Sequence, residues 1–132
     1  MPSQTVEDYL ERIYELIEQK GYARVADIAQ SLGIAQPTVT RMVQRLAVDH
    51  YLVYERYRGM NMTDKGRLVA QKIRRRHHIL ANFFQLLGLS PREVLIEVDG
   101  IEHHLSEAAV TRMERLVSYL KDNPKVVKSL IG

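Results

Sequence analysis

Apolar residues recur every three or four positions along most of the chain, which is the spacing of amphipathic helices. The first such repeat spans about twenty residues and ends before Gly21. Thr5 and Asp8 form a Thr-x-x-Asp pattern at its start, which predicts a capping box there. The apolar face of this predicted helix consists of Val6, Tyr9, Leu10, Ile13, Leu16 and Ile17.

Two further helices are predicted from residue 25 to about Leu46. The first covers residues 25–32, and Gly33 makes the turn after it. Pro37 fits the first position of the next helix, where its missing N–H costs nothing. A two-helix spacing with Gly at the turn is typical of a helix-turn-helix. The buried positions of the later helix are expected to be Val39, Met42, Val43 and Leu46.

The pattern changes at Leu52 to a run of β-formers, followed by Gly59 and an alternating Met-Asn-Met segment. This predicts a β-hairpin with Gly59 at its turn. Beyond it, Thr63 can cap a long helix that runs to about residue 87, and Ser90, Ser106 and Asn123 mark the starts of three more helices.

Three helices followed by a two-stranded hairpin is the order of a winged helix-turn-helix. We therefore predict a mainly α protein with two domains: a winged helix-turn-helix DNA-binding domain at 1–71 and a helical dimerisation and metal-binding domain at 72–132. A homodimer is expected because the helices after Ile73 carry more apolar faces than so small a fragment can bury alone.

The solvent face of the predicted third helix can make hydrogen bonds to DNA. Gln and Arg side chains read base edges bidentately, and Thr contacts a phosphate or a thymine methyl group. Two arginines near the hairpin tip are placed to meet backbone phosphates. The predicted DNA-binding residues are Gln36, Pro37, Thr38, Thr40, Arg41, Gln44, Arg56 and Arg58. A winged helix used only for protein contact is the alternative.

The charge is unevenly distributed along the 132 residues, although the net charge is only +3. Residues 21–78 carry eleven Lys and Arg against four Asp and Glu, whereas residues 1–20 carry five acids against two bases. A basic middle with acidic flanks is what a nucleic-acid footprint beside a cation site would produce. An ordinary soluble surface would also accommodate it.

Several classes of protein are disfavoured by composition. The sequence has no Cys, which removes disulfides, thiolate zinc sites and Cys nucleophiles. No apolar stretch approaches the roughly 18 residues of a membrane span. The N-terminus lacks a signal-peptide pattern. We therefore expect a cytoplasmic protein with no membrane partner.

The most informative motif is the run Asp99-Gly100-Ile101-Glu102-His103-His104. In a helix, Asp99, Glu102 and His103 would sit at i, i+3 and i+4 and share one face. Two carboxylates and an imidazole form a hard donor set that suits Mn²⁺ or Fe²⁺. The bland alternative is a solvated helix face.

Taken together, five stretches resemble the manganese-responsive, two-domain branch of the diphtheria toxin repressor family: residues 7–11, 18–25, 54–59, 76–77 and 100–106. The resemblance implies a homodimeric, Mn²⁺-activated repressor of manganese-uptake genes that binds double-stranded operator DNA. It also implies two Mn²⁺ ions per subunit. The corresponding ligands would be Asp8, Glu11, His77, Asp99, Glu102 and His103.

The sequence departs from this family at Asp99, where Glu is usual. Asp is one methylene shorter, which leaves open whether it bridges two ions. Local roles also remain open for three candidates: Asp8 in the capping box, Glu11 beside Arg12, and His77 as an ordinary helix histidine.

Other functions also remain open. One is an iron-responsive or other divalent-metal repressor of the same family, and another is a winged helix that binds an organic effector. A carboxylate-bridged metal hydrolase is disfavoured because the chain has no His-Glu-x-x-His motif and no apparent nucleophile or base.

Overall fold

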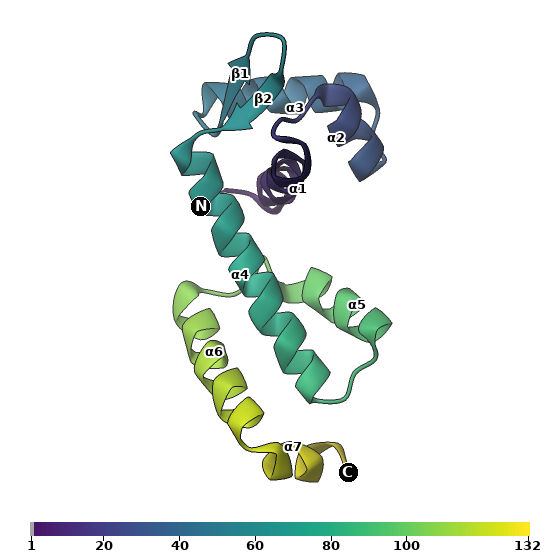
Figure 1. Cartoon of the computed structure of the whole chain (residues 1–132), viewed down its shortest axis with the longest axis vertical. Coiled ribbons are helices and arrows are strands. Elements are labelled where there is room, and N and C mark those ends of the chain that lie inside the picture. The colour runs from purple at the N-terminus through teal and green to yellow at the C-terminus, as the bar shows by residue number, and fades with distance from the viewer. Residues whose placement is uncertain (1) are drawn as a thin grey trace. The chain divides into compact units, whose positions relative to one another are not determined.

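The computed structural model describes residues 2–132 and divides into two compact units, the first ending at Lys72 and the second beginning at Ile73. Both units are mainly helical, as predicted (Figure 1). The elements are α1 (Gln4–Lys20), α2 (Val25–Leu32), α3 (Gln36–Val48), β1 (Leu52–Glu55), β2 (Gly59–Met62), α4 (Asp64–Leu86), α5 (Pro91–Ile101), α6 (Glu107–Asp122) and α7 (Pro124–Ile131).

The predicted cap of α1 at Thr5 is wrong. Ser3 is the N-cap, with extended backbone angles, and its Oγ accepts a hydrogen bond from the N–H of Val6 at 3.2 Å. The helix therefore begins before Thr5, which lies in its first turn. Gly21 ends α1 with a φ of 84°, a left-handed conformation that favours glycine.

Residues 2–72 share one hydrophobic core, formed by α1, α2, α3, the two strands and the start of α4. Leu10, Ile13, Ile28 and Val39 are completely buried in it. The predicted inner face of α3 is confirmed for Val39, Val43 and Leu46, while Met42 is only partly buried. This core holds α3 with its opposite face in solvent.

Strands β1 and β2 form the predicted antiparallel hairpin, which we call the wing (residues 52–62). The turn consists of residues 56–58, and Gly59 pairs with Glu55 as the first residue of β2. The prediction that Gly59 makes the turn is therefore wrong. Tyr57 adopts the left-handed conformation inside the turn, with a φ of 69°, and Gly59 has a φ of 114°.

The base of the wing is closed by the start of α4. The Oγ1 of Thr63 donates to the carbonyl of His50 at 2.6 Å, and its N–H donates to the carbonyl of Tyr51 at 3.1 Å. Thr63 also caps α4, as predicted, by accepting from the N–H of Gly66 at 3.1 Å. Lys65 adds a bond from Nζ to the carbonyl of Asp49 at 2.9 Å. The segments that enter and leave the hairpin are thus joined to each other by hydrogen bonds.

In the second unit, α5 and α6 pack on different faces of α4 (Figure 1). Ile79 joins a core with α6, and its neighbour Leu80 joins a core with α5. The predicted caps at Ser90 and Ser106 are confirmed, because each Oγ accepts from the N–H three residues later. No helix in residues 2–132 combines the length and apolar character needed to span a bilayer.

Candidate metal centre and nucleic-acid interface

The run that contains Glu102 and His103 is not a continuous helix. Helix α5 ends at Ile101, and Glu102 caps it with a bond from its N–H to the carbonyl of Val98 at 2.9 Å. The chain then turns, with the N–H of His104 bonded to the carbonyl of Ile101 at 3.0 Å. The expectation that Asp99, Glu102 and His103 share one helical face is therefore wrong for His103, which lies in the turn.

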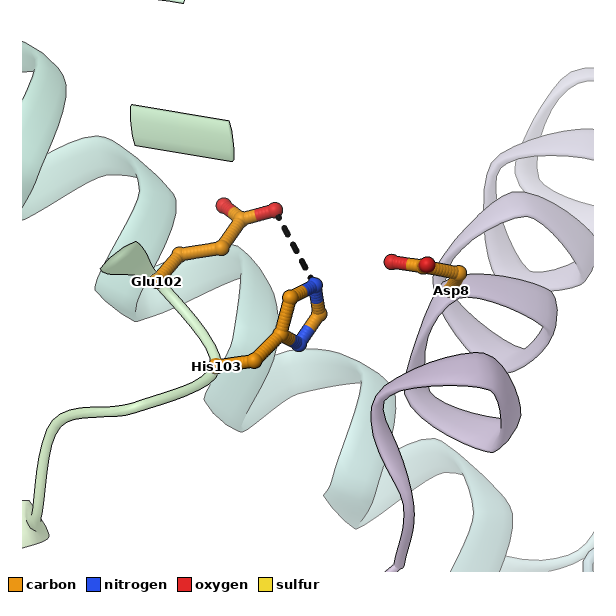
Figure 2. Close-up of side chains that lie close together, drawn as sticks. All are labelled: Asp8, Glu102 and His103. Atoms are coloured by element: carbon orange, nitrogen blue, oxygen red, sulfur yellow. Dashed lines mark ion pairs between the residues drawn. The ribbon is translucent and has the colours of Figure 1, made fainter. Parts of the chain in front are cut away.

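Three of the predicted ligands meet in the second unit, and we call them the donor cluster: His77 from α4, Glu102 and His103. Oε2 of Glu102 lies 3.0 Å from Nδ1 of His77, and Oε1 lies 3.4 Å from Nε2 of His103. Figure 2 shows the His103 ring facing the Glu102 carboxylate. The two oxygens of one carboxylate thus face two different imidazoles.

The chemistry of the donor cluster fits a divalent cation. Glu102 is only 4% exposed, and a buried carboxylate requires compensating hydrogen bonds or positive charge. A neutral imidazole donates a hydrogen bond from one ring nitrogen and offers a metal-ligating lone pair at the other. The cluster offers two nitrogens and two oxygens without sulfur, which disfavours soft ions and suits Mn²⁺, Fe²⁺ and similar ions.

The other three predicted ligands are distributed differently. Asp8 and Glu11 lie three residues apart on α1 in the first unit, so they project from one side of that helix. Because Ser3 caps α1, the capping role considered for Asp8 is wrong. Asp99 is exposed near the end of α5 and takes no part in the contacts of Glu102 with the two histidines.

A charged network that sequence reasoning missed supports α4 next to His77. Nη2 of Arg76 lies 2.7 Å from Oε1 of Glu107, and Nη1 of Arg75 lies 3.3 Å from its Oε2. Nη2 of Arg75 also lies 3.1 Å from Glu114. These pairs tie α4 to α6. The signal was present in the acids of α6, which recur at a seven-residue spacing opposite the Arg74-Arg75-Arg76 run.

The candidate nucleic-acid interface lies on the first unit. The predicted side chains of α3 are exposed, except for Thr40, which is half-buried, and Arg56 and Arg58 are exposed in the turn of the wing. A groove of about 580 Å³ separates α3 from the wing, with Gln44 on one side and Tyr57 on the other. Several residues outside α3 also line this groove, and sequence reasoning missed Arg24, Tyr54 and Tyr57 among them.

Comparisons with known proteins cover both units. Residues 1–60 match the model of the iron dependent repressor N-terminal DNA binding domain, and residues 63–129 match that of the iron dependent repressor metal binding and dimerisation domain. The HTH-type transcriptional regulator MntR of Geobacillus kaustophilus is 48% identical over 98% of this chain and 92% of its own length. The protein of that name from Lysinibacillus sphaericus is 45% identical over 98% of this chain and 94% of its own length.

Solved structures show the same architecture. The manganese regulator SloR is similar with a TM-score of 0.75 and 29% identity, covering 86% of this chain and 54% of that one. The metal-dependent transcriptional regulator MtsR gives a TM-score of 0.80 with 26% identity, covering 86% and 54%. The chain therefore spans about half the length of these solved structures.

Proposed function

Because the chain belongs to the iron-dependent repressor family of DNA-binding transcriptional regulators, we propose that it represses manganese-uptake genes when it holds Mn²⁺. The family consists of regulators and not of enzymes, which removes the hydrolase considered from the sequence. The observation that carries the proposal is the buried carboxylate of Glu102 between two imidazoles, within the segment matched to a metal-binding domain.

The proposed ligands of the metal centre are the donor cluster together with Asp8, Glu11 and Asp99. The donor cluster is supported by its distances, and the three acids by the family resemblance. All six supply hard or borderline ligand atoms, which favours Mn²⁺ over thiophilic ions. The similarity to a regulator described as a manganese regulator points the same way. We propose two ions per subunit, with Asp99 limiting the second.

The ligand set would link metal binding to DNA binding because it draws on both units. Asp8 and Glu11 are on α1, which shares a core with α3, whereas His77, Glu102 and His103 belong to the second unit. A bound cation would supply positive charge to these ligands. Without it, four carboxylates of the set would repel one another at close approach. Ligation would then shift the population toward arrangements that bind operator DNA.

The DNA-binding form is proposed to be a homodimer acting in the cytoplasm. Two α3 helices related by a two-fold axis would enter major grooves roughly 34 Å apart. Apolar side chains of the second unit support a second copy as the partner, since Leu95, Ile96 and Leu116 are 56%, 60% and 45% exposed in the single chain. Their burial would supply the hydrophobic part of a dimer interface.

The proposal is tested by measuring the affinity of the full chain for duplex DNA with and without Mn²⁺, using a duplex selected from a random pool by the Mn²⁺-loaded protein. Glu11→Ala and His77→Ala should keep the fold and the dimer but reduce stimulation by Mn²⁺. The same titration with Fe²⁺ and Zn²⁺ separates a manganese regulator from an iron-responsive one. If both variants retain the full response to Mn²⁺, the metal does not regulate through these ligands.

A further inference from the structure

The turn of the wing is held by a side chain from another part of the first unit. Arg24, the residue before α2, donates from Nη2 to the carbonyl of Tyr57 at 3.1 Å and from Nε to the carbonyl of Arg58 at 3.3 Å. Two neighbouring N–H donors of one guanidinium thus form hydrogen bonds with two consecutive backbone carbonyls. A planar fork makes such a paired contact, and a lysine ammonium cannot reproduce it.

The turn needs such an outside contact. Tyr57 has a φ of 69°, a conformation that is costly for a residue with a bulky side chain. Conformations of this kind persist when the surrounding structure fixes them. The local bond from the N–H of Arg58 to the carbonyl of Glu55 is 3.2 Å long. The contacts of Arg24 therefore add a constraint from outside the hairpin.

The segment around Arg24 is itself fixed against β2. The N–H of Ala23 donates to the carbonyl of Met60 at 3.0 Å, and the N–H of Met60 donates back to Ala23 at 2.7 Å. Gly59 lies so close that a Cβ there would collide with the Ala23 carbonyl and touch the Arg24 side chain. The guanidinium also lies over the ring of Tyr22, 5.0 Å from its centre. Arg24 is thus anchored at its backbone and along its side chain.

We propose that Arg24 is a positioning residue for DNA binding, which holds the wing turn so that Arg56 and Arg58 meet the DNA backbone while α3 lies in the major groove. This inference rests on the proposed function. It adds to the DNA-binding residues one that contacts the wing turn and not the DNA. Arg24 lines the groove between α3 and the wing, together with Gln44 and Tyr57. It therefore sets the spacing of the two surfaces that would hold one DNA strand.

Arg24 is exposed, so the competing role is a direct contact with a phosphate. The two roles differ in their dependence on the wing. A direct contact acts independently of Arg56 and Arg58, and its loss would add to theirs. A positioning residue has no effect once the side chains that it positions are gone. A phosphate contact would also tolerate Lys, whereas the paired carbonyl contact would not.

The experiment is a mutant cycle in the 132-residue chain with Mn²⁺, using the selected duplex and a random-sequence duplex. Arg24→Ala should weaken binding by about tenfold, the effect of roughly one charge-assisted hydrogen bond. In the Arg56→Ala, Arg58→Ala background it should have little further effect, and Arg24→Lys should not restore binding. Arg92→Ala is the control, because Arg92 is an exposed arginine on α5, outside α3, the wing and the proposed metal ligands.

A second readout does not involve DNA or metal. Without Arg24, the backbone N–H of Arg58 should exchange its hydrogen faster in the free protein, while amides in the core of α1 are unchanged. Additive losses in the cycle with rescue by Lys would overturn the proposal, and so would an unchanged affinity. If the wild type binds DNA without any response to Mn²⁺, the proposed function fails, but the cycle on random DNA and the exchange measurement still decide the role of Arg24.

Discussion

Apart from the half-buried Thr40, the residues proposed to contact DNA are exposed on α3 and in the turn of the wing, whereas the donor cluster meets around a carboxylate that is 4% exposed. These side chains come from separate positions on α3 and in the wing turn. In the donor cluster, each of the two oxygens of Glu102 has its own histidine, so the loss of one member disturbs the others. The free-energy effects of substitutions should therefore be nearly additive on the DNA-binding face and strongly non-additive at the donor cluster.

The largest effect is expected from Glu102→Gln, which keeps the side-chain size but removes the charge between His77 and His103. Affinity for Mn²⁺ should fall by about 100-fold or more, since even outer partners of metal ligands typically contribute 10- to 100-fold. Calorimetric titration measures this, and the helical circular dichroism should be retained. Glu97→Gln is the control, because Glu97 is exposed on α5, the helix that Glu102 caps. An unchanged affinity for Mn²⁺ would show that the donor cluster is structural.

The DNA face should show smaller and separable effects. Arg41→Ala should cost about 1–3 kcal/mol on the selected duplex and relax the choice of sequence, because Arg41 lies on the exposed face of α3. Arg56→Ala and Arg58→Ala should weaken binding to all sequences and reduce its dependence on salt concentration. Fluorescence anisotropy over a salt series separates the two cases. Equal weakening of selected and random DNA by Arg41→Ala would contradict a base-reading role.

Substitution of one helical glycine in each unit shows how closely the helix there packs against its surroundings. A Cβ at Gly66 in α4 would collide with the carbonyl of Tyr51, whereas a Cβ at Gly100 in α5 meets nothing within 4 Å. Gly66→Ala should therefore lower the free energy of unfolding by about 1–3 kcal/mol. Gly100→Ala should raise it by about 0.5–1 kcal/mol, because Ala is the better helix former. Thermal denaturation of both variants tests this, and equal effects would contradict the close approach at Gly66.

The smallest effect is expected at Asp99, which is exposed near the end of α5. Asp99→Glu lengthens the side chain by one methylene and should strengthen the second Mn²⁺ event by a few-fold, because hard cations are sensitive to ligand geometry. Calorimetry of wild type and variant gives the two affinities. Two tight, equal events in the wild type that do not change in the variant would argue against a limiting role for Asp99.

Elements with a clear apolar repeat and a local start signal could be predicted from the sequence. Helix α2 was predicted correctly from its apolar positions. The caps at Thr63, Ser90 and Ser106 were predicted correctly because capping depends on neighbours within three residues. The cap of α1 was misplaced because Ser3 competes with Thr5 as an acceptor. The end of α5 was missed because nothing in the apolar spacing distinguishes Ile101 from the turn that follows it.

Contacts between distant segments could not be predicted from apolar repeats or capping signals. Three contacts depend on the tertiary fold: the pairing of Ala23 with Met60, the hydrogen bonds of Arg24 to the wing turn, and the contact of His77 with Glu102. Sequence spacing showed none of these three contacts. The family resemblance supplied the ligand assignment, but no local pattern indicated that Arg24 would contact the wing.

The closed base of the wing also makes residues 52–62 a transferable segment. His50 and Tyr51 on one side and Thr63 on the other are joined by hydrogen bonds that do not involve any side chain of the hairpin. A wing from a related regulator could therefore be transplanted between these positions to change the sequences that are bound. The transplant would have to keep glycine at position 59, because the backbone of Ala23 occupies the space that any larger residue would need.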